Sequence, residues 1–313
     1  MNFSDKLAEQ INLKKNPTIL GLDPKLEYIP VSIKEKHNIN NGESSKAAAD
    51  SIIEFNKRLI DSTFDIIPAI KPQLAYYEMY GIEGLRAFYE TVRYAKTKGL
   101  LVIADGKRND IGTTAEAYAT AYLGKTDIYG NETESFGCDA LTVNAYLGID
   151  GIKPFIDMCE KNDKGIFALV KTSNPSSGQL QDLELADGRL IYEAMADLVE
   201  QWGSTTVGEC GYSSIGAVVG ATYPKQLLEL RKRMPRAWIL VPGYGAQGGT
   251  AADVTKAFDK NGMGAVINAS RSLMCAYKLD AWKDKFTLDE FDKAARAEAQ
   301  RMRDDINKER ENI

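Results

Sequence analysis

The sequence predicts a single (β/α)8 barrel over residues 1–313, with an extra helix at each end of the chain. Eight short apolar runs alternate with segments of helical periodicity, an order typical of right-handed βαβ units and a parallel sheet. No linker-like stretch divides the 313 residues. Eight such units in one domain favour a closed barrel over an open doubly wound sheet.

The first half of the chain supplies four of the strands. Leu7 and Ile11 lie four residues apart after Ser4, a possible N-cap, so a leading helix is expected over 3–12. Residues 34–45 are polar and are expected to form a loop insertion. The other expected elements are strands at 18–23, 65–73, 100–105 and 138–144, and helices at 46–64, 81–98, 114–123 and 150–161.

The second half follows the same alternation. A long polar loop is expected over 174–182, between the fifth strand and its helix. The charged residues 286–313 have a helical composition and are expected to form a C-terminal helical extension. The expected strands are 165–173, 214–221, 237–243 and 264–268, and the expected helices are 190–202, 224–233 and 250–260.

The composition excludes several classes of function. A net charge of −5 gives no sign of a basic nucleic-acid-binding surface, and no apolar run reaches the length of a membrane span. The N-terminus lacks the pattern of a signal peptide, so we expect a cytoplasmic protein. Four scattered cysteines form no CxxC pair, which argues against a zinc site and a disulfide framework. His37 is the only histidine, so proton transfer must fall mainly to Lys, Asp, Glu or Tyr.

Three charged residues gather where the third strand stops. Asp105 and Lys107 project from the same face if the strand continues through Gly106, because strand side chains alternate. Asp110 lies beyond the strand, in a loop that closes on Thr113–Glu116, a sequence of capping-box form. A surface ion pair is the alternative interpretation. A wholly apolar strand that delivers charge to its C-terminal end is, however, the usual layout of an α/β active site.

The other strands also end in polar residues. In a barrel these ends meet at one face, where the active site lies. Such a concentration of polar side chains is difficult to explain by packing alone. The strand-end set is Asp23, Lys71, Asp105, Lys107, Asn144, Lys171, Thr172, Ser173, the loop at Gly243, and Arg271.

The loop after the seventh strand, Pro242–Gly249, contains the pattern GxGxxG. It is a weak dinucleotide fingerprint, because it follows the seventh strand and no acid ends the next one. It is better placed as a phosphate cradle, since the loops after strands seven and eight commonly bind phosphate in barrels. Arg271 adds a forked donor that suits a phosphate. The residues thus predict a small phosphorylated substrate. No metal cluster is obvious, although three acids near one mouth could hold Mg²⁺ with waters.

The stretch from Asp105 to Thr114 resembles the DxKxxDIxxT motif of the orotidine 5′-phosphate decarboxylase family. The resemblance extends from about Gly21 to Met274, and its motifs occur in the family's order. The loop after the fifth strand and the extra length are similar to the longer bacterial subgroup. The supporting stretches are Gly21–Pro24, Ala69–Pro72, Pro242–Gly249 and Ser270–Arg271.

The resemblance implies that orotidine 5′-phosphate loses CO2 to give UMP, the last step of de novo pyrimidine nucleotide synthesis, without metal or organic cofactor. Lys71, Asp105, Lys107 and Asp110 would form a charged quartet, in which Lys107 protonates C6. Asp105 would crowd the departing carboxylate. Asp110 and Thr114 would reach into the partner's site, which makes the enzyme a homodimer with shared active sites.

The resemblance also implies how substrate is held. Asp23 and Lys71 would bind the ribose hydroxyls. Thr172 and Ser173 compete for the pyrimidine edge, and Ser173 is preferred. Closure of the 174–182 loop would be driven by phosphate binding. The remaining substrate-binding residues implied are Pro242, Gln247 and Arg271.

Three alternatives remain. A sugar-phosphate decarboxylase similar to keto-gulonate-phosphate decarboxylase shares DxKxxD but needs Mg²⁺, and its second strand usually ends in an acid where this chain has Lys71. A nicotinamide oxidoreductase would use the glycine-rich loop. A nucleotide-binding barrel without catalytic activity is the third alternative.

Overall fold

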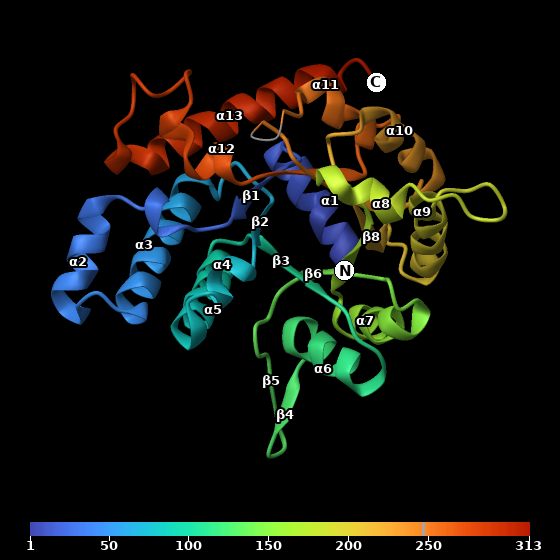
Figure 1. Cartoon of the computed structure of the whole chain (residues 1–313), viewed down its shortest axis with the longest axis horizontal. Coiled ribbons are helices and arrows are strands. Elements are labelled where there is room, and N and C mark those ends of the chain that lie inside the picture. Colours follow the sequence, from blue (N-terminus) through green and yellow to red (C-terminus); the bar gives the residue numbers. More distant parts are fainter. Residues whose placement is uncertain (246–247) are drawn as a thin grey trace.

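The computed structural model describes residues 1–245 and 248–313. It contains a closed barrel of eight parallel strands in the order β1-β10-β9-β8-β7-β6-β3-β2, which confirms the predicted fold. Figure 1 shows the course of the chain, with helices packed around these strands. Each expected strand corresponds to one strand of the barrel. The strands are β1 (Thr18–Leu22), β2 (Ala69–Pro72), β3 (Leu101–Arg108), β6 (Ala140–Val143), β7 (Gly165–Lys171), β8 (Ser213–Val219), β9 (Ala237–Pro242) and β10 (Ala265–Ala269).

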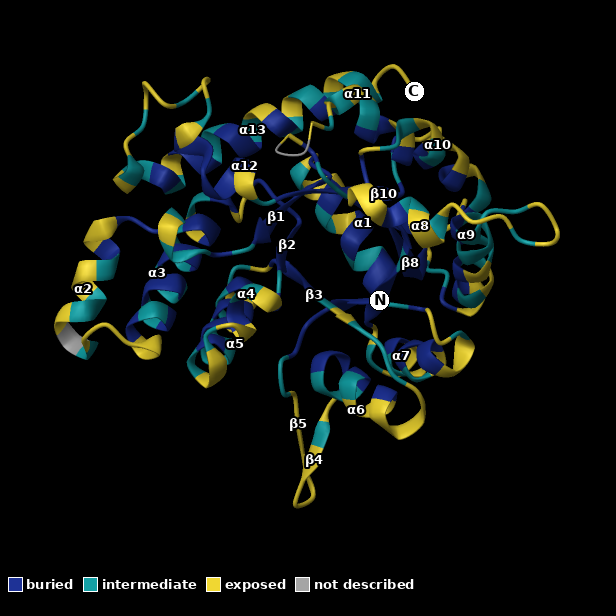
Figure 2. Cartoon of the chain, in the orientation of Figure 1, coloured by how far each residue is buried: buried dark blue, intermediate teal, exposed yellow. Residues whose placement is uncertain are grey.

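Helices surround the barrel and bury the faces that they turn towards the strands, whereas their outer faces are exposed (Figure 2). None of the described helices combines the length and apolar character needed to cross a membrane. The helices are α1 (Phe3–Lys14), α2 (Val31–Asn41), α3 (Ser45–Thr63), α4 (Ala75–Glu78), α5 (Gly81–Thr97), α6 (Gly112–Leu123), α7 (Ile149–Asn162), α8 (Gly178–Gln181), α9 (Ile191–Trp202), α10 (Pro224–Arg233), α11 (Ala251–Val254), α12 (Arg271–Met274) and α13 (Phe291–Arg310). The C-terminal extension is therefore helical, as expected.

Helix α1 packs against the inward-facing side chains of the strands. Phe3 is buried and meets Phe167 edge to face, with ring centroids 6.0 Å apart. The expected N-cap was wrong: Asn2 caps the helix by accepting a hydrogen bond from the Asp5 amide (2.9 Å). Ser4 lies inside the first turn of the helix. Its buried hydroxyl accepts a hydrogen bond from the Trp238 indole (2.7 Å).

Replacing Phe3 with alanine is expected to lower the free energy of unfolding by about 3–5 kcal/mol, because it leaves a cavity under the barrel. Urea unfolding followed by circular dichroism measures this change. Leu13→Ala on the same helix is the control, since the Leu13 side chain is 72% exposed and its loss should change stability by less than about 0.5 kcal/mol. Equal effects of the two substitutions would contradict the role of Phe3 as a barrel plug.

Residues 34–45 do not form the expected loop, because most of them belong to α2. Ile33 and His37 lie one turn apart on the face of α2 that meets α3. Ile33 is buried, and His37 Nε2 lies 2.8 Å from Glu54 Oε2 of α3. This narrow contact face supports a helix whose other residues are mostly polar, and the polar composition alone therefore misled the prediction.

Two other helix boundaries differ from expectation. The sequence Thr113–Glu116 does not form a capping box, because α6 already begins at Gly112 and its N-cap, Ile111, makes no side-chain cap. Gly112 has a φ of 54°, which allows the chain to turn into the helix early. The helix expected over 250–260 is reduced to α11 and one further 3-10 turn at Thr255–Ala257. A small antiparallel hairpin, β4 (Thr126–Ile128) and β5 (Asn131–Thr133), was not predicted.

Candidate active site

A cavity of about 690 Å³ opens where the barrel strands end. Residues from β1, β2, β3, β6, β7, β8, β9 and β10, or from the loops that follow them, line it. This arrangement confirms that strand-end side chains converge, as the parallel barrel requires. The predicted residues that line the cavity are Asp23, Lys71, Asp105, Lys107, Thr172, Ser173, Pro242 and Arg271.

Asp105 forms the centre of the polar cluster. Its Oδ2 accepts hydrogen bonds from Lys71 Nζ (2.6 Å) and Gln73 Nε2 (2.9 Å). Its Oδ1 accepts hydrogen bonds from Lys107 Nζ (2.6 Å) and Thr142 Oγ1 (2.8 Å). Strand β3 continues through Gly106, and Asp105 and Lys107 are in contact as expected. The strand is irregular at this point, because its register against β6 shifts between Ala104 and Arg108 and Lys107 has a φ of 45°. Four donors hold the carboxylate in a single orientation.

The surroundings of Asp105 keep it ionised. Burial acts to raise its pKa, but the nearby Lys71 and Lys107 ammonium groups together outweigh burial and hold the pKa well below its usual value. Lys71 is also buried; burial acts to lower its pKa, but the Asp105 and Asp23 carboxylates raise it above the ordinary lysine value. Asp105 and Lys71 are therefore both charged. A buried carboxylate and two ammonium groups form a fixed electrostatic frame.

Replacing Asp105 with asparagine is expected to lower the free energy of unfolding by about 3–5 kcal/mol at pH 7, because buried Lys71 loses its closest counter-charge. The folded-state pKa of Asp105 lies below the unfolded value, so its contribution is complete above the unfolded pKa and is lost as the pH falls. The difference between the wild type and the variant should therefore narrow below about pH 4. Denaturant unfolding at several pH values measures both effects.

The control for that substitution is Asp187→Asn. Asp187 forms an ion pair with Arg189 in which both side chains are about half exposed, at 51% and 41%. Exposed ion pairs contribute little to stability, so this variant should remain near the wild-type stability. If Asp105→Asn were equally stable, the charged cluster would not hold Lys71 in the way that the contacts indicate.

Asp23 lies next to the charged cluster, just after β1. Burial raises its pKa above the ordinary value against the opposing effect of Lys71, and the Asp105 carboxylate adds to the rise. Its Oδ1 is buried and has no hydrogen-bond partner among the described residues. Gly21 of β1 leaves room for Ser270, which follows the neighbouring strand β10. A Cβ at Gly21 would lie 1.9 Å from Ser270 Oγ. The unsatisfied oxygen of Asp23 is available for a hydroxyl group of a ligand.

The glycine-rich loop and Arg271 lie on another side of the cavity. Gly243 has a φ of 103° and Gly245 a φ of 72°, conformations that favour glycine, and the Gly245 amide donates to the Gly249 carbonyl (2.9 Å). Arg271 is exposed at the start of α12 and forms no ion pair within the described part of the chain. Its guanidinium is thus free for an anion. Gln247, the other predicted phosphate contact, lies outside the described residues.

The hydrogen bonds distinguish Thr172 from Ser173. The Thr172 amide donates to Gln181 Oε1 (3.0 Å), and its hydroxyl accepts from Gln181 Nε2 (2.8 Å) and donates to Asn174 Oδ1 (2.6 Å). The Ser173 hydroxyl makes no hydrogen bond to any residue that the structure describes, and it lines the cavity. Of the two, Ser173 is the one with a hydroxyl free for a ligand.

Asp110 and Thr114 do not line the cavity of their own chain. Asp110 Oδ1 accepts a hydrogen bond from the adjacent Ile111 amide (2.9 Å), and Thr114 is exposed on α6. Neither residue contacts Lys71, Asp105 or Lys107 among the described contacts. The structure of one chain therefore brings together three members of the predicted quartet and leaves Asp110 outside.

Sequence reasoning missed some residues of the site and misplaced others. Gln73 and Thr142 bind Asp105 but were not predicted. The signal for Gln73 was its spacing of two from Lys71 along the strand; an isolated Thr142 gave none. Asn144 follows β6 and Lys171 ends β7, as expected, but neither residue lines the cavity. Among residues 1–245 and 248–313, no three His, Cys, Asp or Glu side chains form a group that could hold a metal ion.

Comparisons with known proteins agree with this geometry. A family model described as "Orotidine 5′-phosphate decarboxylase / HUMPS family" matches residues 19–282. An orotidine 5′-phosphate decarboxylase of Rhodopirellula baltica is 46% identical over 278 residues, which cover 89% of this chain and 90% of the relative. The enzyme of the same name from Caldicellulosiruptor saccharolyticus is 40% identical over 313 residues and 98% of each chain.

Solved structures show the same likeness. The OMP decarboxylase of Leishmania donovani superposes with a TM-score of 0.75 at 32% identity, and the match covers 99% of both chains. The UMP synthase of the same organism gives a TM-score of 0.77 at 33% identity, and this chain spans 57% of that longer protein. The chain therefore belongs to the orotidine 5′-phosphate decarboxylase family of carboxy-lyases, as the resemblance of its motifs predicted.

Proposed function

We propose that the protein removes CO2 from orotidine 5′-phosphate to give UMP, the last step of pyrimidine nucleotide synthesis, in the cytoplasm. The observation that carries the proposal is Asp105, which lies 2.6 Å from both the Lys71 and the Lys107 ammonium groups at the cavity. Relatives that match 89–98% of the chain carry the name of this activity. The second strand ends in Lys71 rather than an acid, which favours this reaction over that of a magnesium-dependent sugar-phosphate decarboxylase.

Lys107 is the proton donor in this mechanism. When the bond between C6 and the carboxylate carbon breaks, CO2 leaves and the electron pair stays on C6. The Lys107 ammonium gives its proton to C6, and the resulting amine is protonated again from water after product release. Its side chain is 44% exposed, so this exchange has a route to solvent.

Asp105 acts by its charge and its fixed position. The ionised carboxylate crowds the substrate carboxylate, a repulsion that is relieved as CO2 departs. Because four hydrogen bonds restrain Asp105, it cannot turn away from the incoming charge. Binding energy from the remote parts of the substrate offsets this ground-state repulsion. The catalytic groups are thus organised before substrate arrives.

The rest of the cavity supplies that remote binding energy. Arg271 and the glycine-rich loop hold the phosphate, with Gln247 completing the grip. Asp23 and Lys71 bind the ribose hydroxyls, a role supported by the unpaired buried Oδ1 of Asp23. Ser173 contacts the pyrimidine edge, since Thr172 is already engaged by Gln181. Pro242 lines the wall between these regions.

The active enzyme is a homodimer in which Asp110 and Thr114 enter the partner's cavity. Their position away from their own cavity supports this arrangement. Apolar side chains are exposed beside them at Ile111 (53%), Tyr146 (73%), Leu147 (44%) and Ile149 (46%). The segments around Asp110 and Leu147 lie side by side. A Cβ at Gly151 would lie 3.0 Å from the Asp110 carbonyl oxygen and 3.3 Å from the Leu147 Cβ. An exposed apolar surface of this kind favours a protein contact.

The proposal is tested by adding metal-depleted protein to orotidine 5′-phosphate and following the loss of its ultraviolet absorbance. Turnover that persists in EDTA is expected. Loss of activity in EDTA, with recovery on adding Mg²⁺, would instead support the magnesium-dependent alternative. Protein that binds UMP but shows no turnover with or without Mg²⁺ would support the third alternative, a nucleotide-binding barrel without catalytic activity.

A further inference from the structure

Strand β7 ends in a buried lysine that the mechanism does not use. Lys171 is fully buried and does not line the cavity, whereas Leu169 and Thr172 on either side of it do. The register of β7 against β8 shifts between Leu169 and Lys171. An irregularity of this kind changes the direction of a side chain. It explains why Lys171 faces the surrounding helices, although sequence order placed it at the barrel mouth.

The ammonium group of Lys171 has a defined environment. Its Nζ lies 2.6 Å from Asp182 Oδ1, the residue that follows α8. It also lies 5.4 Å from the ring centroid of Tyr192 on α9 and 5.0 Å from that of Tyr223 before α10. Two aromatic faces and one carboxylate thus compensate a buried positive charge. The Asp182 side chain is 41% exposed, so the segment that carries it lies at the surface.

The segment 172–182 forms the rim of the cavity. The ion pair between Lys171 and Asp182 brings the two ends of this segment together. Gln181, next to Asp182, holds both the amide and the hydroxyl of Thr172. The chain leaves the barrel at Lys171 and Thr172 and is tied back to these two residues by Gln181 and Asp182. Thr172, Ser173, Asn174 and Gln181 all line the cavity. The position of Ser173 therefore depends on both ties.

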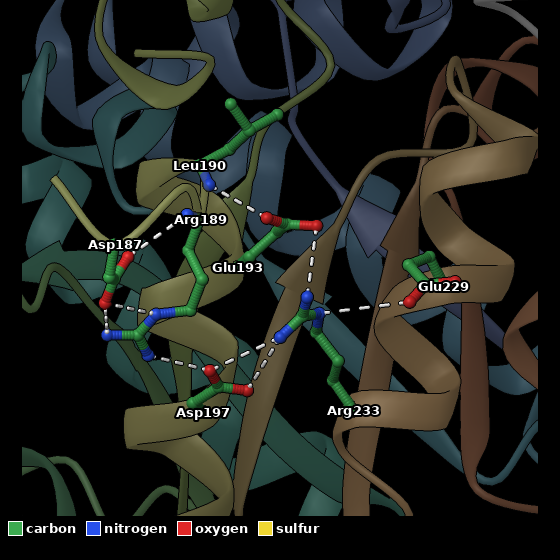
Figure 3. A network of polar contacts seen from close by, with 7 residues as sticks. All are labelled: Asp187, Arg189, Leu190, Glu193, Asp197, Glu229 and Arg233. Carbon is green, nitrogen blue, oxygen red and sulfur yellow. Dashed lines mark hydrogen bonds and ion pairs between the residues drawn. The ribbon is translucent and has the colours of Figure 1, made fainter. Parts of the chain in front are cut away.

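A network of charged contacts joins α9, the loop before it and α10 (Figure 3). Arg189, from the loop before α9, and Arg233 of α10 both bind Asp197 of α9, at 2.9 and 3.4 Å. Arg233 also binds Glu193 Oε1 (3.3 Å), and Glu193 Oε2 accepts the Leu190 amide (2.8 Å). The network joins α9 to α10, the region that carries Tyr192 and Tyr223.

We propose that Lys171 is a positioning residue: through Asp182 it holds the rim segment 172–182 so that Ser173 meets the ring of the substrate. The inference rests on the proposed function, since that function places the pyrimidine at this rim. Lys171 does not touch substrate. Its loss frees the rim from the barrel and weakens recognition of the ring, while the phosphate side, built from Arg271 and the glycine-rich loop, keeps its affinity.

The test compares UMP with ribose 5-phosphate, which lacks the ring, in calorimetric binding to Lys171→Met and Asp182→Asn. Methionine keeps much of the side-chain volume without the charge. We expect Kd for UMP to rise at least about tenfold in both variants, and kcat/KM for orotidine 5′-phosphate to fall on the order of a hundredfold in Lys171→Met. Kd for ribose 5-phosphate should stay within about twofold. Asp182→Glu, which keeps the carboxylate, should recover most of the UMP affinity.

Lys164→Met is the matched control. Lys164 is the residue before the opposite end of β7, is also buried, and lies 3.7 Å from Asp139 Oδ1. Its loss removes a buried lysine next to the opposite end of β7 without changing the rim. We expect this variant to lose stability in thermal unfolding and to bind UMP as the wild type does.

Several outcomes would overturn the assignment. One is unchanged UMP affinity in both rim variants, and another is an equal loss for UMP and ribose 5-phosphate, which a general structural defect would produce. If Lys171→Met fails to fold, Asp182→Asn and Asp182→Glu decide alone, since Asp182 is partly exposed. Wild-type protein that does not turn over orotidine 5′-phosphate would remove the proposed function and this assignment with it. Wild-type turnover with unchanged rim variants removes the assignment alone.

Discussion

Replacing Lys107 with alanine is expected to reduce kcat for orotidine 5′-phosphate by at least about a thousandfold, because in the proposed mechanism C6 loses its proton donor and a fixed positive charge. UMP has no carboxylate at C6, so its Kd should change by less than about threefold. Single-turnover absorbance measures the chemical step, and calorimetry measures UMP binding. The separation of catalysis from binding is the result that distinguishes an enzyme from a nucleotide-binding barrel.

Lys283→Ala is the control for this variant. Lys283 is an exposed lysine that pairs with Asp280 (2.6 Å) outside the cavity, so its loss should leave kcat unchanged. A Lys107→Ala protein that keeps more than about a tenth of wild-type kcat would contradict a proton-donor role. Equal losses of UMP affinity and kcat would instead indicate that Lys107 acts mainly in binding.

The fold and the centre of the site were predictable because both depend on local patterns. Eight apolar runs specified the strands, and parallel strands bring their C-terminal ends to one face, so Asp23, Lys71 and Asp105 had to meet. The two-residue spacing of Asp105 and Lys107 predicted their contact, but the register shift in β3 and the φ of 45° at Lys107 were not predicted. Helix α2 was harder to predict from the sequence, because its contact face with α3 is narrow and most of its residues are polar.

Other features depend on contacts that no local pattern contains. The outward turn of Lys171 results from a register shift between two strands far apart in sequence. The choice between Thr172 and Ser173 depends on Gln181, whose amide group occupies Thr172. Thr142 reaches Asp105 only because β6 lies beside β3. These are tertiary contacts, and the identity of their partners is set by the assembled barrel.

The position of Asp110 outside its own cavity leads to the second large effect. A mixed dimer of Lys107→Ala and Asp110→Ala chains is expected to have about half of the wild-type kcat, because one of its two sites combines an intact Lys107 with an intact Asp110 from the partner. Each parent homodimer should have less than about 1% of wild-type activity. The mixed species is isolated by co-expression with a different affinity tag on each chain and two successive purifications.

The matched control is a mixed dimer of Lys107→Ala with Lys71→Ala. Both residues line the cavity of their own chain, so each site of this dimer retains one defect and activity should stay at the level of the parents. Activity in the first mixture but not in the second would place Asp110 in the partner's site. No activity in the first mixture, or failure to isolate any doubly tagged protein, would contradict shared sites. Equal activity in the two mixtures would point to contamination by wild-type enzyme, which separate preparation of each parent excludes.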